Sequence, residues 1–262
     1  MSLPPVNVKV KVRKIDLASK LDEIIEDDVA VEAPIEVTLN RRPVATLLAS
    51  PTQTEDLALG LVIDEGIIET VANITDVRAM GNTVEIKAND SVIRKKNLRD
   101  MGLMLPSCGS TLYRKEDNGV SWPSVRSNCK AKAQDIVQMI GKLCTSSVYF
   151  PKTGATHSAA AFFDNEMKAL AEDVGRHNAI DKVIGSCSIQ RLDFSRTVLV
   201  TTGRQPADLV LKAARVGIPI VVSMRGPIHS GVLAAERTGV TLVCFARGSR
   251  MNVYTHMERI TV

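Results

Sequence analysis

Aromatic side chains are scarce in this chain: they make up 3% of its 262 residues, with one tryptophan and three tyrosines. Proteins that bind single-stranded nucleic acid stack successive bases on aromatic rings, and such a surface is hard to build from so few rings. The basic residues also exceed the acidic ones only slightly, 33 against 29, which gives a formal net charge of +4. We therefore expect no nucleic-acid partner.

Long apolar runs are absent as well. No run approaches the ~20 residues that a membrane helix needs, and the N-terminus lacks the basic-then-apolar order of a secretory signal. The cysteines are odd in number and scattered, which argues against a disulfide framework and for reduced thiols. We expect a cytoplasmic protein without a membrane partner. The five cysteines are Cys108, Cys129, Cys144, Cys187 and Cys244.

What the chain does contain is the composition of a globular protein with a full core, 45% hydrophobic and 24% charged, and its length predicts two domains. Residues 1–97 are predicted to form a small α+β domain. Thr54 is expected to cap a helix that Gly66 ends. The other expected elements are a strand over 6–13, a hairpin over 35–49 that turns at Asn40 to Pro43, and strands over 74–80 and 83–87.

Residues 98–130 lose both the helical and the strand periodicity and are rich in glycine, proline and serine. Irregular stretches longer than about 12–15 residues are usually functional or disordered. We therefore predict a flexible loop over 98–130, and Cys108 lies within it.

From residue 131 to 262, apolar strand patterns alternate with helical ones. This alternation predicts an α/β domain with a largely parallel sheet and helices on both faces. The expected helices cover 131–143, 178–187, 207–216 and 232–237, and the expected strands cover 155–163, 197–201, 218–223 and 240–245, with a last edge strand over 253–256.

Cys108 is the cysteine with the clearest chemical potential, because it lies in the loop sequence Leu-Pro-Ser-Cys-Gly-Ser-Thr with no apolar periodicity to bury it. An exposed thiol on such a loop can become a thiolate and carry sulfur as a persulfide. Its position alone predicts an incidental loop cysteine equally well. Three further cysteines are expected to be small buried hydrophobes, namely Cys144, Cys187 and Cys244. The pattern around Cys129 predicts neither burial nor reactivity.

Polar clusters occur at three predicted element ends. Residues 172–178 place Arg176 and His177 just before a helix, where backbone N–H groups and a guanidinium can hold an anion; the alternative is a solvated helix start in which Asp173 pairs with Arg176. His157 and Arg204 lie in two turns of small polar residues. Ligands of open α/β sheets bind at the carboxyl ends of the strands, so these turns together predict a pocket.

A fourth polar segment follows the last buried strand. Its two guanidiniums are spaced around glycine and serine and could hold phosphates, although a solvated basic turn explains them equally well. The segment consists of Phe245, Ala246, Arg247, Gly248, Ser249 and Arg250.

Several common chemistries are excluded by missing motifs. The zinc deaminases need H-x-E followed by P-C-x-x-C, but His157 is followed by Ser158 and Ala159 and no P-C-x-x-C is present, so we expect no resident metal. The Walker and dinucleotide-binding glycine patterns are missing too, which argues against ATP hydrolysis and nicotinamide chemistry.

Taken together, these residues resemble the formate dehydrogenase accessory sulfurtransferase (FdhD) family over nearly the whole chain. The resemblance implies a sulfurtransferase that takes sulfur from a cysteine desulfurase as a cysteine persulfide. It further implies transfer to bis-molybdopterin guanine dinucleotide, the molybdenum cofactor, which is held as a bound substrate before it enters formate dehydrogenase. The motifs that carry the resemblance are residues 64–67, 173–182, 202–204, 212–219 and 245–250, with Asn252.

The resemblance also implies a fold, an assembly and residue roles. The fold pairs the small N-terminal domain with a cytidine-deaminase-like three-layer sandwich, and the assembly is a homodimer. Cys108 becomes the persulfide carrier and residues 245–250 part of the cofactor-binding site. Many members carry C-x-x-C in the loop, whereas this chain has Thr111 at the second position, so transfer depends on one thiol.

We extend these implied roles to the polar clusters. Arg176 and Arg204 would help to hold the cofactor's phosphates, and His157 and His177 would polarise or protonate groups near the transfer. Two other functions remain open at this point: a chaperone that shelters the molybdenum cofactor without sulfur chemistry, and a guanine-nucleotide sensor.

Overall fold

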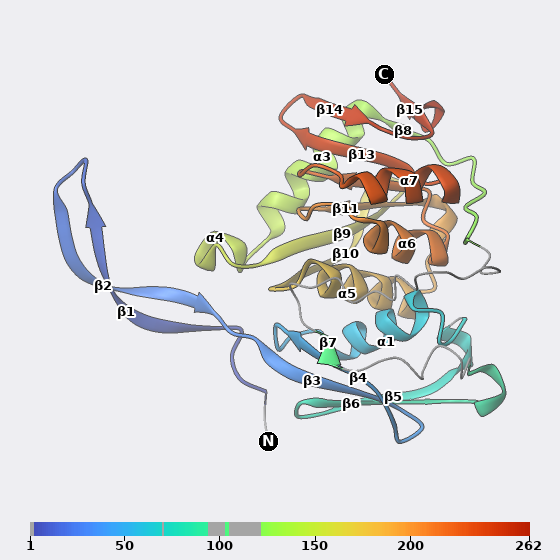
Figure 1. The fold of residues 1–262 in the computed structure, drawn as a ribbon, viewed down its shortest axis with the longest axis horizontal. Coiled ribbons are helices and arrows are strands. Elements are labelled where there is room, and N and C mark those ends of the chain that lie inside the picture. The colour runs from blue at the N-terminus through green and yellow to red at the C-terminus, as the bar shows by residue number, and fades with distance from the viewer. Residues whose placement is uncertain (1–2, 70, 94–102, 105–121) are drawn as a thin grey trace.

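The computed structural model describes residues 3–69, 71–93, 103–104 and 122–262 (Figure 1). In this part of the chain the protein has a mixed α/β fold, with two main sheets, helices packed between and around them, and a two-stranded arm that projects from the body. Cys108 and Thr111 lie outside the described residues. The predicted domain boundaries at residues 97 and 130 stay a prediction.

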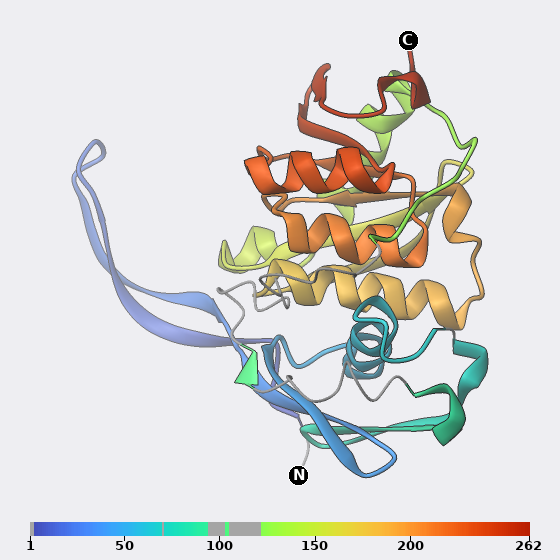
Figure 2. The ribbon, with the colours of Figure 1, turned by 45° about the vertical axis from the view of Figure 1, so that its right-hand side comes forward.

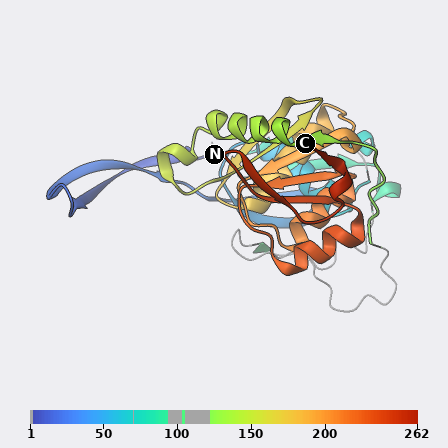
Figure 3. The ribbon, with the colours of Figure 1, turned by 90° about the horizontal axis from the view of Figure 1, so that it is seen from above.

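The arm is an antiparallel ribbon of β1 (Asn7–Asp16) and β2 (Leu21–Ala30), paired over ten residues each. Figures 1, 2 and 3 all show it extending away from the body. The alternation over 6–13 predicted the first strand correctly. The second strand was missed because five acidic residues break its alternation.

The N-terminal sheet has the strand order β5-β6-β3-β4-β7. Its hairpin turns at Asn40 and Arg41, whose φ angles of 49° and 65° are the left-handed values of a type I′ turn, so the predicted hairpin is confirmed. The strands β3 (Ala33–Leu39), β4 (Arg42–Ala49), β5 (Ile74–Met80), β6 (Thr83–Ala88) and β7 (Leu103–Met104) are accompanied by 3-10 turns at Val71–Asn73 and Asp90–Val92.

Helix α1 (Thr54–Asp64) packs between this sheet and α5 (Arg176–Ile189) and is buried on nearly every side. The two helices touch through glycine: a Cβ on Gly60 would lie 1.8 Å from the Asp181 carbonyl oxygen. The hydrophobic core therefore runs without a break from the N-terminal sheet to the C-terminal half. Thr54 is the first helical residue and Gln53 is the N-cap, so the predicted Thr54 cap is wrong.

The C-terminal sheet has the order β10-β9-β11-β12-β13-β14 and is not largely parallel as predicted. Only β11 with β12 and β12 with β13 pair in parallel; the outer pairs are antiparallel. The prediction failed because two hairpins flank the parallel centre. The strands are β9 (His157–Phe163), β10 (Glu166–Asp173), β11 (Thr197–Thr201), β12 (Ile220–Ser223), β13 (Thr241–Arg247) and β14 (Arg250–Val253).

Two details of these hairpins correct the sequence analysis. Strand β10 was not predicted, and it is joined to β9 through Asp164 and Asn165, whose φ angles are positive. The last edge strand covers 250–253 and not 253–256, because the chain turns back on β13 directly after Gly248. Residues 245–250 therefore form the bulged end and turn of a hairpin.

Helices cover both faces of this sheet, as predicted, which gives three layers. Helix α3 (Ala133–Ser146) lies on one face, and α5, α6 (Ala207–Val216) and α7 (His229–Thr238) lie on the other, as Figures 2 and 3 show. The short α4 (Phe150–Thr153), a small parallel pair of β8 (Ala131–Lys132) with β15 (Ile260–Thr261), and 3-10 turns at Phe194–Arg196 and Met257–Arg259 complete the described fold. No helix within the described ranges is long and apolar enough to cross a membrane.

Candidate functional site

Several of the predicted polar turns meet at one edge of the C-terminal sheet. Thr201, at the carboxyl end of β11, pairs with Ser223 of β12 and with Ala159 of the antiparallel β9. The residues that follow β11 and β12 and those that begin β9 therefore share this edge. Helices α5, α6 and α7 also begin there, each directly after a loop from the sheet.

His157 is the centre of this arrangement. Burial lowers the pKa of His157, and the positive charges of Arg176, Arg225 and Arg204 lower it further. The imidazole is therefore neutral at pH 7 and surrounded by guanidinium groups. We call this surface, defined by His157, Arg176, Arg204 and Arg225, the cationic edge.

The helix ends add to the positive potential of the cationic edge. The N-caps of α5, α6 and α7 are Gly175, Pro206 and Ile228, and none of them caps the helix with a side-chain hydrogen bond. First-turn N–H groups without such a cap carry partial positive charge and favour anions.

Two buried polar atoms at this edge lack a hydrogen-bond partner among the described residues. The side chain of Arg176 lies against Gly203, where a Cβ would come within 3.0 Å of the Arg176 Cβ, and its Nε has no acceptor. Gln205 is fully buried; its Nε2 donates to the Gly203 carbonyl at 2.9 Å, while its Oε1 has no donor. An unmatched donor and an unmatched acceptor on two side chains that both contact Gly203 suit a polar ligand.

Neither of the two acidic residues next to this edge pairs with Arg176. Asp173 accepts hydrogen bonds from the Lys182 Nζ at 2.6 Å and from the Asn178 amide, so the alternative Asp173–Arg176 pair is wrong. Glu172 accepts from the backbone N–H groups of residues 148–150 and so orders the start of α4. The Arg176 guanidinium is therefore not neutralised by either carboxylate.

His177 differs from His157 because a carboxylate holds it. Its Nε2 lies 2.8 Å from Asp208 Oδ2, which joins the first turn of α5 to the first turn of α6. The structure thus gives His177 a positioning contact.

Phe245 reaches the same region through a β-bulge. Strand β13 shifts register between Cys244 and Arg247, and Phe245 has a φ of 53°, in the left-handed region. Its side chain is 40% exposed, and its ring lies against Gly226, where a Cβ would be 2.8 Å from the ring. The bulge therefore turns an aromatic ring outward beside Arg225, whose carbonyl accepts from the Phe245 N–H.

The remaining residues of this segment divide into two groups. Ala246 is fully buried under α3, so only its backbone is available to a ligand. Arg247, Gly248, Ser249 and Arg250 are all exposed, and the two arginines are cross-strand neighbours.

Two further residues of this edge, Gln205 and Arg225, were not predicted from the sequence. Both follow the carboxyl end of a buried strand, β11 and β12, so the rule that located Arg204 would have found them. Among the described residues, no group of three or more His, Cys, Asp or Glu side chains could hold a metal ion.

The described cysteines are all poor nucleophiles. Burial raises the pKa of Cys129 and of Cys144, and it raises the pKa of Cys187 and Cys244 to about 12. Cys187 and Cys244 are buried as predicted, whereas Cys144 is exposed and its Sγ lies 3.7 Å from the Met224 sulfur.

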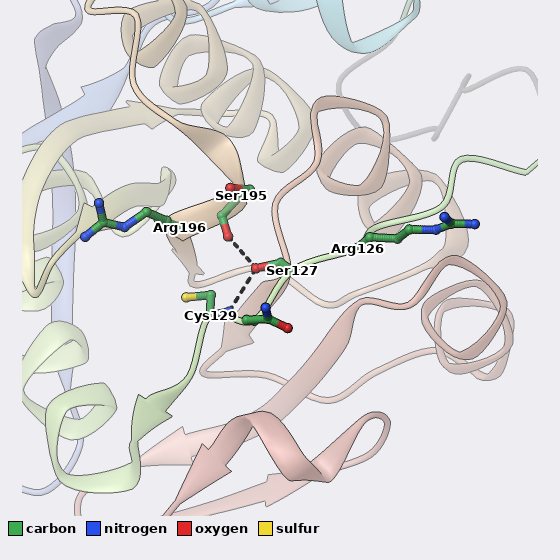
Figure 4. A pocket seen from close by; sticks show the side chains of 6 residues that line it. Arg126, Ser127, Cys129, Ser195 and Arg196 are labelled. Carbon is green, nitrogen blue, oxygen red and sulfur yellow. Dashed lines mark hydrogen bonds between the residues drawn. The ribbon is translucent and has the colours of Figure 1, made fainter.

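Cys129 lies at the opposite edge of the sheet. It lines a pocket with Ser127 and Arg196, which Figure 4 shows together with Arg126. Arg196 precedes β11 and Thr201 ends it, so the pocket is about 16 Å from the cationic edge. Cys129 is therefore not part of the candidate site.

Much of the sequence that carries the family resemblance forms buried ion pairs. Lys212 of α6 meets Asp64 at 2.7 Å, Glu65 at 3.0 Å and Asp181 at 3.0 Å. Lys182 of α5 meets Asp173 and the carbonyl of Ser50. These motifs join α1 and the N-terminal sheet to the C-terminal half.

Comparison with known proteins identifies the family. The model of the FdhD/NarQ family matches residues 30–261. The protein named sulfur carrier protein FdhD from Methanothermobacter thermautotrophicus is 34% identical over 247 residues, 94% of each chain, and that from Sulfolobus acidocaldarius is 33% identical over 256 residues, 96% of this chain and 98% of the relative. A crystal structure of a candidate formate dehydrogenase accessory protein from Desulfotalea psychrophila superimposes with a TM-score of 0.80 at 26% identity, covering 98% of this chain and 100% of the other. The chain therefore belongs to the FdhD/NarQ family.

Proposed function

We propose that this protein is a sulfur carrier in formate dehydrogenase maturation. It accepts sulfur from a cysteine desulfurase as a persulfide on Cys108 and delivers it to bis-molybdopterin guanine dinucleotide. The names of its relatives, sulfur carrier protein, support the general role. The observation that carries the proposal is the cationic edge, because the cargo is a polyanion with two diphosphates.

The cationic edge offers matched groups for such a cargo. Arg176, Arg204 and Arg225 supply charge for the diphosphates, and the helix starts supply N–H donors. The exposed ring of Phe245 offers a stacking surface for a guanine base, and Arg247 and Arg250 extend the positive surface along the hairpin turn.

Cys108 is assigned as the carrier by elimination as well as by resemblance. Four of the five cysteines have pKa values raised by burial, which disfavours the thiolate that attacks a persulfide. In the loading step, the Cys108 thiolate attacks the terminal sulfur of the desulfurase persulfide. A new S–S bond forms on Cys108, the old S–S bond breaks, and the desulfurase cysteine leaves as a thiolate, so no external oxidant is needed.

The two histidines take different parts in this proposal. His157, neutral and close to three guanidiniums, can accept a proton when an anion arrives. His177 is bound to Asp208 and positions the starts of α5 and α6. We also propose that the protein acts as a homodimer in the cytoplasm.

Intact mass spectrometry after incubation with a cysteine desulfurase and cysteine tests the carrier role. We expect the wild type to gain the mass of one sulfur atom and Cys108→Ala to gain none. Cys129→Ala and Cys144→Ala are the matched controls and should load like the wild type. Loading of Cys108→Ala would refute the assignment of Cys108.

Thr111, which stands in place of a second loop cysteine, favours one alternative, a chaperone that binds the cofactor without sulfur chemistry. It predicts no mass gain in any variant but undiminished binding of a guanine diphosphate. A guanine-nucleotide sensor would differ from both, since it would bind GDP as tightly as the complete cofactor.

A further inference from the structure

The loop that follows β11 presents one backbone donor at the cationic edge. The N–H of Arg204 has no acceptor in the part of the chain that the structure describes. Arg204 is exposed, so a ligand can reach this N–H. The other three N–H groups of residues 202–205 bond inside the protein, to the Ser158 carbonyl at 3.0 Å, to Thr201 Oγ1 at 3.2 Å and to the Gly226 carbonyl at 3.3 Å.

The direction of this N–H follows from the peptide bond that Arg204 shares with Gly203. Among the described residues no peptide bond is cis, and in a trans peptide the C=O and the N–H point in opposite directions. The Gly203 carbonyl points inward, where it accepts hydrogen bonds from Gln205 Nε2 at 2.9 Å and from Ser223 Oγ at 2.6 Å. Both of these side chains are fully buried. The Arg204 N–H therefore points outward, next to the Arg176 side chain that lies against Gly203.

The backbone of Gln205 holds its side chain in this position. Its N–H donates to the Gly226 carbonyl, and its own carbonyl accepts from the Ile228 N–H at 2.9 Å, which joins the loop after β11 to the loop after β12. Helix α7 packs directly on Gln205, since a Cβ on Gly231 would lie 2.2 Å from the Gln205 carbonyl oxygen. The side-chain amide therefore has little freedom to turn away from the Gly203 carbonyl.

The oxygen of the same amide destabilises the folded protein. Gln205 Oε1 is buried and has no donor among the described residues, and a buried acceptor without a partner lowers stability. A methionine of the same length would fill this space without a polar atom. The amide at position 205 is therefore explained by the bond from its Nε2 to the Gly203 carbonyl, and not by the stability of the core.

We propose that the Arg204 N–H binds an oxygen of the ligand's diphosphate, and that Gln205 is the positioning residue that holds this donor outward. The proposal rests on the diphosphate cargo put forward above and adds a donor to the guanidinium charges. A backbone N–H that is already oriented needs no reordering when the anion arrives, unlike an exposed arginine side chain. Gln205 itself is buried and acts through the peptide bond between Gly203 and Arg204.

Isothermal titration calorimetry with GDP tests the role of Gln205. Gln205→Met removes the amide but keeps the length of the side chain, and GDP affinity should fall by about 10-fold, the effect of one hydrogen bond to a charged group. The matched control is Gln190→Met, at the opposite end of α5. Gln190 also donates from its Nε2 to a backbone carbonyl, that of Lys168 at 3.0 Å, and its loss should leave GDP affinity unchanged. Equal affinities of Gln205→Met and the wild type would overturn the proposal.

Urea unfolding separates a positioning role from a structural one. Because Gln205→Met removes a buried acceptor that has no donor among the described residues, the variant should unfold at the same urea concentration as the wild type or at a higher one. A loss of GDP affinity without a loss of stability distinguishes a residue that orders the site. A lower urea midpoint for Gln205→Met would show that the amide stabilises the fold, and would overturn the proposal.

The amide resonance of Arg204 reports on the donor itself. In protein isotope-labelled at arginine, inorganic pyrophosphate should move the Arg204 amide proton downfield in the wild type as the hydrogen bond forms, and should move it less in Gln205→Met. A wild type that binds GDP while its Arg204 amide does not shift would overturn this proposal alone. A wild type that binds no GDP would overturn the diphosphate cargo of the proposed function as well.

Discussion

His157 lies among three guanidinium groups, so its protonation reports what those groups hold. Burial and the charges of Arg176, Arg225 and Arg204 keep its pKa below the ordinary 6.5. A bound diphosphate offsets these positive charges, and we expect saturating GDP to raise the pKa of His157. NMR titration of the imidazole carbons measures the shift directly.

The same linkage fixes the pH dependence of binding. Because the complex holds the proton more tightly than the free protein, GDP affinity should increase as the pH falls through the pKa of His157. The variant His157→Gln should lose this dependence while it retains binding at pH 8. An unchanged His157 pKa at saturating GDP would place the diphosphate away from the cationic edge.

At the scale of elements, the bulge in β13 gives Phe245 its orientation. Cys244 and Ala246 on either side are buried, and the register shift lets Phe245 turn outward. If its ring stacks on guanine, Phe245→Ala should weaken GDP binding by about 1–3 kcal/mol, which is about 5- to 150-fold. Isothermal titration calorimetry measures this loss.

Phe150→Ala is the matched control for that measurement. Phe150 is also an exposed phenylalanine, 50% accessible, but it lies in α4 outside the hairpin. Its removal should leave GDP affinity unchanged. Equal losses in the two variants would show that the effect is not stacking at Phe245.

Elements with local signals could be predicted from the sequence, and those fixed by long-range pairing could not. Asn40 and Arg41 mark their turn because short-range backbone preferences dictate it. Strand β10 ends in Glu172 and Asp173, which look like a solvated cluster until Lys182 is found to pair with Asp173. The predicted parallel direction of the outer strands was wrong. An alternation of helical and strand patterns along the sequence does not show that β9 and β10 form a hairpin at Asp164.

The candidate site was predictable to a similar degree. The carboxyl-end rule located Arg204, and the cluster before α5 located Arg176, because both are consequences of local order along the chain. That Gly203 makes room for Arg176, and that Gln205 Oε1 is left without a donor, depends on packing between loops that no sequence pattern records.

At the scale of the whole molecule, the two halves are held together by α1. Helix α1 approaches α5 at Gly60 and at Gly185, where a Cβ would lie 1.9 Å from the Asp56 carbonyl oxygen. One hydrophobic core includes side chains from both halves. We therefore expect the body of the protein to unfold in a single cooperative transition and not as two separate units.

Lys212 is the charged residue at this junction, and its removal tests the coupling. It is 3% exposed and contacts carboxylates from α1 and α5. Lys212→Met would leave Asp64, Glu65 and Asp181 buried without their ammonium group, and breaking a buried ion pair costs about 3–5 kcal/mol. Urea unfolding followed by circular dichroism should show one transition, shifted by that amount. Two separated transitions would contradict the coupling.

Asp64→Asn is the control within the same cluster. It also tests how the stability of the folded protein depends on pH. Burial and the nearby Asp181 raise the pKa of Asp64 well above its usual range. Between the usual and the raised pKa the folded protein therefore holds a proton there that the unfolded chain has released, and above the raised pKa Asp64 is the carboxylate that pairs with Lys212. The Asp64 contribution to stability is therefore present at low pH and is lost as the pH rises through the raised pKa. Asparagine resembles the protonated acid, so the variant should lie within about 1 kcal/mol of the wild type at low pH. It should also lose less stability than the wild type as the pH rises. If Asp64→Asn instead lost stability more steeply than the wild type as the pH rises, Asp64 would be ionised beside Lys212. All three carboxylates around Lys212 would then be charged at this junction.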